Sequence, residues 1–189
     1  MQTLNPTARV ILGMIKLGRN TGYDIKSLVD VSTRHFWAAS YGQLYPELKR
    51  LEQDGLITGR DEPSGGRRRR VYELTEDGER ALHDWLASDE KPSYELRDEG
   101  LLKIFFGDSM SADELVRAVQ ANRRLHEGVG AALREIEPHA RDAETRFPYL
   151  TLQAGLAEHD HMAAWWREVE ERLARGEDPH VPADPKEQQ

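Results

Sequence analysis

Residues 40–51, with the sequence SYGQLYPELKRL, contain the strongest structural signal in the chain. A serine followed three residues later by a glutamine is a capping box, which predicts a helix that begins at Ser40. Three leucines then recur at helical spacing and share one face: they are Leu44, Leu48 and Leu51. Gly55 ends the helix. Because an internal proline removes a backbone hydrogen bond, Pro46 predicts a bend near the helix start.

Two further helices are expected before this one. Asn5 is a good N-cap and Pro6 suits the first helical position, where the missing N–H costs nothing. Gly18 is expected to end that helix. Thr21, with Asp24 three residues later, predicts the start of a second helix.

Two strand-like runs follow, at residues 56–60 and 67–74, and residues 61–66 between them have the composition of a turn. Thr75 then caps a fourth helix. Three helices, a two-stranded wing and another helix are the pattern of a winged helix-turn-helix, which predicts a DNA-binding domain at residues 1–87.

The second half is expected to be helical. Residues 88–98 are polar and contain proline, so we predict a linker there. Residues 99–176 form the predicted helical domain. Residues 177–189 hold three prolines and are expected to be a disordered tail. The fold class is therefore mainly α, with an N-terminal winged helix and a C-terminal helical domain.

Two long helices dominate the predicted C-terminal domain. Ser111 opens the first with a capping box, and Pro138 is expected to stop it. The second begins after Pro148 and ends at Gly176. Both are apolar along one stripe and charged elsewhere, so we expect them to pair between two subunits of a homodimer. A chain cut before residue 148 is then expected to be monomeric.

Composition narrows the possible functions. The 189-residue chain has no cysteine, which excludes disulfides, thiolate metal sites and cysteine nucleophiles. Its net charge is −8, but residues 1–87 carry +1 and residues 88–189 carry −9, so DNA can still meet a basic patch in the first half. No leader or membrane-spanning stretch is evident, which predicts a cytoplasmic protein. No catalytic grouping is found either, so neither an enzyme nor a cofactor is expected.

Six residues on the third helix are candidates for DNA contact, because base edges and phosphates are read by polar and cationic side chains at such positions: they are Ser40, Tyr41, Gln43, Tyr45, Lys49 and Arg50. A glutamine can read adenine through two hydrogen bonds. In the alternative interpretation Gln43 merely caps the helix and Tyr45 packs in the core.

A run of four arginines is the sharpest local feature. Arg67, Arg68, Arg69 and Arg70 follow two glycines, which would place four permanent cations at a flexible wing tip. Phosphate neutralisation and narrow minor grooves both favour arginine. The alternative is a solvated charge run compensated by Asp61 and Glu62.

The last predicted helix contains a pair of tryptophans and a pair of histidines, which could bind an effector or a metal. Trp165 and Trp166 could line a pocket for a small planar hydrophobic effector, or could be core or dimer interface. We expect Trp166 to be buried in the dimer contact. His159 and His161 stand at i, i+2, which does not suit a shared metal, so a solvated helix face is expected and no metal site.

The N-terminal half resembles the PadR family of transcription regulators over most of residues 8–80. The matching segments are residues 21–25, 42–48, 50–52, 55–57 and 70–75, together with Gly78. The family pattern also carries the proline in the third helix. The longer PadR subgroup is matched more loosely in the second half, by Leu152, Gly155, Glu158 and Trp165.

This resemblance implies a homodimer built through its C-terminal helices, usually a repressor that binds double-stranded operator DNA and often is released by a small molecule. The MarR family shares the winged helix but places dimer helices on both sides of it, whereas here the first helix begins near residue 6. An alternative from another class is a winged-helix module that binds protein partners without an operator. The arginine run argues against that alternative.

Overall fold

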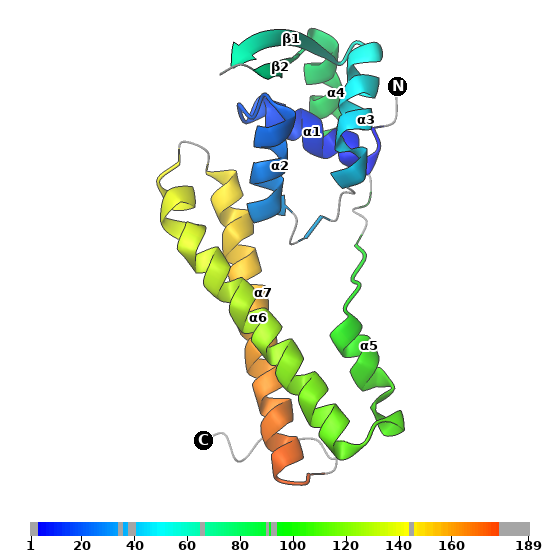
Figure 1. Cartoon of the computed structure of the whole chain (residues 1–189), viewed down its shortest axis with the longest axis vertical. Helices are drawn as coiled ribbons and strands as arrows, with labels where there is room; N and C mark the ends of the chain where they lie inside the picture. The colour runs from blue at the N-terminus through cyan, green and yellow to red at the C-terminus, as the bar shows by residue number, and fades with distance from the viewer. Residues whose placement is uncertain are drawn as a thin grey trace. The chain divides into compact units, whose positions relative to one another are not determined.

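The computed structural model divides into two compact units, an N-terminal unit at Met1–Ser93 and a C-terminal unit at Tyr94–Gln189 (Figure 1). Each unit is described by itself. The structure describes residues 4–33, 36–37, 41–64, 67–89, 91, 94–143 and 146–177, without the side chains of Tyr41, Ser64, Arg67 and Arg68. Ser40, Gly65, Gly66 and the expected tail beyond residue 177 lie outside this range.

The N-terminal unit contains the expected helices and wing. Its elements are α1 (Pro6–Lys16), α2 (Gly22–Val31), a 3₁₀ turn η2 (Tyr41–Gln43), α3 (Leu44–Gln53), β1 (Ile57–Ser64), β2 (Arg67–Leu74) and α4 (Glu76–Leu86). The predicted caps are confirmed: the side chains of Asn5, Thr21 and Thr75 each accept a backbone N–H in the first turn of their helix. Gly18 and Gly55 follow α1 and α3 with left-handed φ angles of 78° and 73°.

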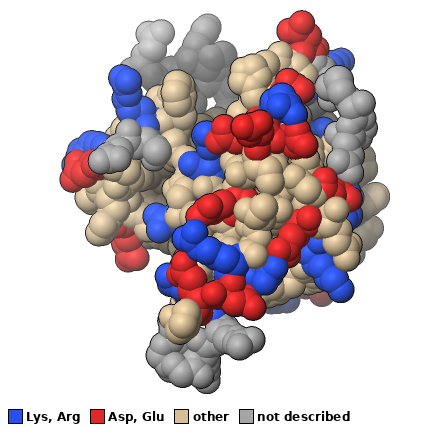
Figure 2. Space-filling model, turned by 90° about the horizontal axis from the view of Figure 1, so that it is seen from above, with Lys and Arg blue, Asp and Glu red and all other residues tan. Residues whose placement is uncertain are grey.

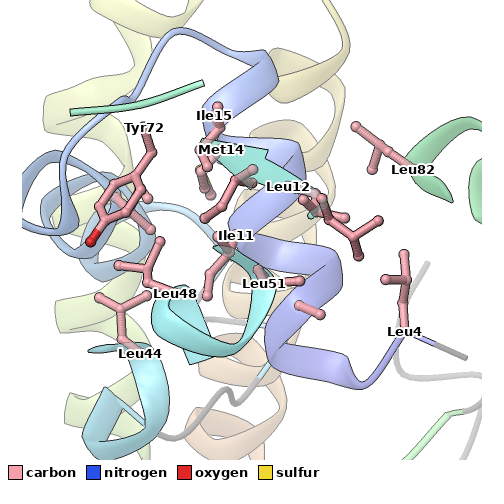
Figure 3. Packing of buried hydrophobic residues seen from close by; sticks show 14 of the residues in the cluster. Leu4, Ile11, Leu12, Met14, Ile15, Leu44, Leu48, Leu51, Tyr72 and Leu82 are labelled. Atoms are coloured by element: carbon pink, nitrogen blue, oxygen red, sulfur yellow. The ribbon is translucent and has the colours of Figure 1, made fainter. Parts of the chain in front are cut away.

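One apolar core joins these elements (Figure 3). Leu48 and Leu51 of α3 are fully buried against Ile11 and Leu12 of α1, and Tyr72 closes the core from the wing. Fully burying one such aliphatic side chain contributes about 1.5–3 kcal/mol. The leucine stripe of α3 therefore faces inward and leaves the opposite face of the helix exposed.

The start of α3 differs from the sequence prediction. The α-helix begins at Leu44, after the 3₁₀ turn, and not at Ser40. Pro46 consequently lies in the first turn, where a backbone N–H has no partner within the helix. The bend predicted from an internal proline is therefore not needed.

The wing is longer than its sequence suggested. β1 and β2 pair antiparallel with Ile57 opposite Leu74 and Ser64 opposite Arg67, so most of the predicted turn at residues 61–66 is strand. Polar and apolar residues do not alternate clearly in this segment, so its sequence did not predict a strand. The N–H of Tyr72 also donates to the carbonyl oxygen of Asn20 at 2.7 Å, which ties the wing to the start of α2.

The C-terminal unit is helical, with α5 (Glu99–Phe105), a 3₁₀ turn η3 (Gly107–Ser109), α6 (Ala112–Arg141) and α7 (Phe147–Ala174). Ser111 and Glu114 form the predicted capping box of α6. Pro138 does not stop α6, because its missing N–H costs only one bond in the last turns and the helix continues to Arg141. Gly176 follows α7 with a φ of 67°, as expected of a helix end.

The helices α6 and α7 form an antiparallel hairpin (Figure 1). Arg123 of α6 bonds Glu170 of α7, while Glu137 lies opposite Tyr149, so later residues of α6 meet earlier residues of α7. The buried apolar residues of this seam are Val119, Leu133, Leu152, Ala163 and Trp166. The sequence predicted that the two stripes pair between subunits, and the hairpin shows that a part of both stripes is already buried within one chain. Among the described residues, none of the helices is both long and apolar enough to span a membrane.

Candidate DNA interface

The outer face of α3 presents three of the predicted residues to solvent. Gln43, Tyr45 and Lys49 are exposed, whereas the leucines between them are buried. Gln43 stands at the N-cap position of α3, where its side chain forms no capping bond, while Ser40, its partner in the predicted capping box, lies outside the described residues. The Tyr45 side chain is 61% exposed and is not a core residue.

The ring of Tyr45 lies close to the start of α2. A Cβ atom added at Gly22 would lie 2.7 Å from Cε1 of the Tyr45 ring, closer than atoms can approach. A larger residue at position 22 would therefore make the ring shift. The exposed Tyr45 ring of α3 therefore lies against the first residue of α2.

Arg50 belongs to a different arrangement. Its Nε donates to both carboxylate oxygens of Glu47 at 3.1 Å, and its Nη1 lies 3.1 Å from Asp54. Glu47 is buried and also accepts from Nδ2 of Asn5 at 3.1 Å. Burial raises the pKa of Glu47, but the hydrogen bonds from Arg50 and Asn5 outweigh this and the pKa is lowered. Glu47 thus fastens α3 to Asn5 at the start of α1, and Arg50 is already satisfied by carboxylates.

The described wing arginines are paired with acids, as the alternative interpretation proposed. Arg69 contacts Glu62 at 3.2 Å, and Arg70 contacts Asp61 at 3.0 Å and also Glu52. Both arginines lie on strand β2 and not on a turn. The side chains of Arg67 and Arg68 are outside the described part. Basic and acidic side chains accordingly lie next to one another in Figure 2. Such exposed pairs contribute about 0–1 kcal/mol, so phosphate could replace the carboxylates at small cost.

Glu52 is a structural residue that the sequence did not reveal. Its Oε1 accepts the backbone N–H of Gly59 at 3.1 Å and also binds Arg70. One carboxylate at the end of α3 therefore holds both strands of the wing. Glu52 lies four residues after the buried Leu48, so both are on the inner side of the helix. This spacing was the feature of the sequence that could have indicated its structural role.

The two adjacent tryptophans differ in burial. Trp166 is fully buried and Trp165 is half-buried, with ring centroids 4.7 Å apart at an interplanar angle of 70°. Among the described residues none accepts a hydrogen bond from Nε1 of Trp166. The expectation that Trp166 is buried in a dimer contact is wrong, because the α6–α7 hairpin of a single chain already covers it.

Two family models match the chain. The model "Transcriptional regulator PadR-like family" matches residues 11–84, and "Virulence activator alpha C-term" matches residues 96–174. Together they cover nearly all of the described residues of both units. The chain belongs to the PadR-like family of transcriptional regulators. The family and longer subgroup predicted from the sequence are thereby confirmed.

Relatives of known structure agree with this assignment. A PadR-like regulator from Bacillus cereus has a TM-score of 0.81 at 23% identity, and covers 90% of this chain and 99% of its own. Bacillus subtilis PadR in complex with operator DNA has a TM-score of 0.80 at 27% identity, with 91% and 99% covered. The same protein with p-coumaric acid has a TM-score of 0.72 at 27% identity, with 90% and 99% covered. These structures confirm the predicted fold class.

A sequence comparison gives a more local match. The "Negative transcriptional regulator PadR" of Bacillus subtilis is 38% identical over 105 residues, which are 55% of this chain. The match spans 58% of that relative's length. This chain therefore spans less than two thirds of that relative's length at the sequence level.

His159 departs from the solvated helix face that was expected. Its Nδ1 lies 2.9 Å from Nδ1 of His126 on α6, and His126 is buried. His161 is exposed, as two residues further along a helix requires. Within the described ranges, no three His, Asp or Glu side chains are grouped so that they could hold a metal ion.

Proposed function

We propose that this protein is a homodimeric transcriptional regulator that binds double-stranded operator DNA, with α3 in the major groove and the wing beside the phosphate backbone. The observation that carries the proposal is the outer face of α3, where Gln43, Tyr45 and Lys49 are exposed while the leucines of the same helix are buried. An exposed recognition helix is what base contact requires. The operator complex of Bacillus subtilis PadR supports this reading.

The dimer is proposed to form through the C-terminal helices. Leu102, Phe105 and Phe106 are 57%, 81% and 59% exposed, and the two phenylalanine rings contact each other edge to face at 5.1 Å. Apolar groups gathered in this way mark a protein contact. A second copy of the chain is the proposed partner, because two recognition helices are needed to read a two-fold symmetric site.

Repression with release by a small planar hydrophobic effector is proposed as the mode of regulation. Trp165 is half-buried beside Trp166, whose buried Nε1–H could gain a hydrogen bond from such a ligand. The negative regulator of Bacillus subtilis and its p-coumaric acid complex support the proposal. A compound of this class that releases DNA is expected to change tryptophan fluorescence. Release without any such change would place the effector elsewhere.

Lys49→Ala is expected to reduce the slope of log affinity against log salt concentration by about 0.9, because one phosphate contact is lost. Lys49 is exposed and no described residue forms an ion pair with it. Binding of a fluorescent duplex, taken from upstream of the protein's own gene, should be titrated at several salt concentrations.

Arg50→Ala is the matched control for this measurement. The two residues are neighbours on α3, but the guanidinium of Arg50 is occupied by Glu47 and Asp54. The Arg50 variant should therefore be less stable and keep the full salt slope. A Lys49 variant with an unchanged slope, or an equal reduction in both variants, would contradict the proposed phosphate contact.

A further inference from the structure

We propose that His126 and His159 form an acid-sensitive joint in the α6–α7 hairpin, which accepts one proton and separates when a second one arrives. The Nδ1 atoms of the two rings lie 2.9 Å apart. Their ring centroids are 5.1 Å apart, and the ring planes are tilted by 41°. His126 is only 8% exposed, so water cannot replace the partner ring without a change in packing.

The number of protons decides whether this contact attracts or repels. In the neutral pair one ring carries its proton on Nδ1 and donates it to the bare Nδ1 of the other, whose proton is on Nε2. One added proton converts the donor ring into an imidazolium, and the contact becomes a stronger, charge-assisted hydrogen bond. A second added proton must occupy the accepting Nδ1. Two N–H groups and two positive charges then face each other, so the rings must move apart.

The surroundings oppose the second proton. Burial and the neighbouring His126 hold the pKa of His159 below its ordinary value of 6.5, against the opposite effect of Glu158 and Asp160. Asp160 on α7 is bonded by Arg134 of α6 at 2.6 Å. Glu127, the residue after His126 on α6, is paired with Arg123 of the same helix and with Arg167 of α7.

Separation of the rings would loosen the seam between α6 and α7. A Cβ atom at Gly130 would lie 3.9 Å from Cβ of His159, so the two helices are close at this level. Trp166 lies seven residues, or two turns, beyond His159 on the same face of α7 and is fully buried in the same seam. An acid-induced opening therefore reaches the largest buried side chain of the unit.

The direction of the pH effect follows from the lowered pKa. The unfolded chain binds a proton at this histidine near pH 6.5, before the folded chain does. The stability linked to His159, the ring that takes the second proton, is complete above that pH and is lost as the pH falls through the lower pKa of the folded state. The joint thus works on acidification and not on alkalinisation.

The test compares thermal unfolding of the full chain at about pH 7.5 and pH 5.5 for the natural protein, His159→Gln and His161→Gln, in buffers with a chelator. Glutamine can hydrogen bond to His126 but takes up no proton. The melting temperature of the natural protein should fall by on the order of 2–4 °C more than that of His159→Gln. His161→Gln removes an exposed histidine of the same helix and should behave as the natural protein.

An equal fall in melting temperature between the two pH values in all three proteins would overturn the proposal. Proton NMR of the imidazole rings in the natural protein gives a second test that needs no folded variant. Two rings that titrate in separate, coupled steps support the joint, and two rings that titrate independently at an ordinary histidine pKa contradict it. Both measurements use the protein without DNA, so their results do not depend on whether the protein binds an operator.

Discussion

Replacing Trp166 by alanine lowers the free energy of unfolding by about 3–5 kcal/mol in our expectation, because a fully buried indole leaves a cavity that the α6–α7 seam cannot close. Denaturant unfolding followed by circular dichroism measures this loss. The C-terminal unit has few large buried residues, and Trp166 is the largest of its fully buried side chains among those described. The effect should therefore appear as a separate, earlier transition of this unit.

Trp165→Ala is the natural control. It removes the same side chain one residue earlier, where the indole is only half-buried. A loss well below that of Trp166→Ala is expected, since less apolar surface returns to water. Equal losses in the two variants would show that Trp166 is not the central packing residue of the hairpin.

A chain that ends at residue 93 is expected to bind operator DNA about 10²–10⁴-fold more weakly than the full chain. Its core from Leu4 to Leu82 lies within the N-terminal unit, so it should remain folded. The loss arises because two recognition helices are no longer linked in one molecule. Analytical ultracentrifugation should show a monomer, and a mobility-shift titration measures the affinity.

Truncation at residue 93 is preferred because it removes the whole C-terminal unit. The cut before residue 148 suggested by the sequence would remove α7 and uncover Val119 and the rest of the α6 seam. The chain that ends at residue 93 would contradict the proposed dimerisation through the C-terminal helices if it stayed dimeric or bound DNA as tightly as the full chain.

A substitution tests the same contact in the full chain. Phe105→Glu should weaken the dimer, whereas Leu86→Glu, at a similarly exposed position of α4, should not.

The sequence predicted best those features of the fold that depend on residues close to one another along the chain. The caps at Asn5, Thr21, Thr75 and Ser111 each act within one helical turn, so their residue types predicted four helix starts. The start of α3 was misplaced because a 3₁₀ turn and a capping box share the same local pattern.

Contacts between distant residues could not be predicted in the same way. The pairing of Arg70 with Asp61 depends on strand register, and its pairing with Glu52 depends on how the wing packs on α3. The contact of His126 with His159 requires the antiparallel hairpin, whose alignment the apolar stripes alone did not fix. Exposure of Gln43 and Lys49 could be predicted, because the leucine stripe of their own helix determines which face is buried.

Footprinting of the full chain on DNA from upstream of its own gene tests the central claim most directly. A dimer with one winged helix per chain should protect two half-sites related by two-fold symmetry, with centres about one helical turn, or ~34–36 Å, apart. A single asymmetric half-site occupied by one chain, or no protection at any site, would contradict the account.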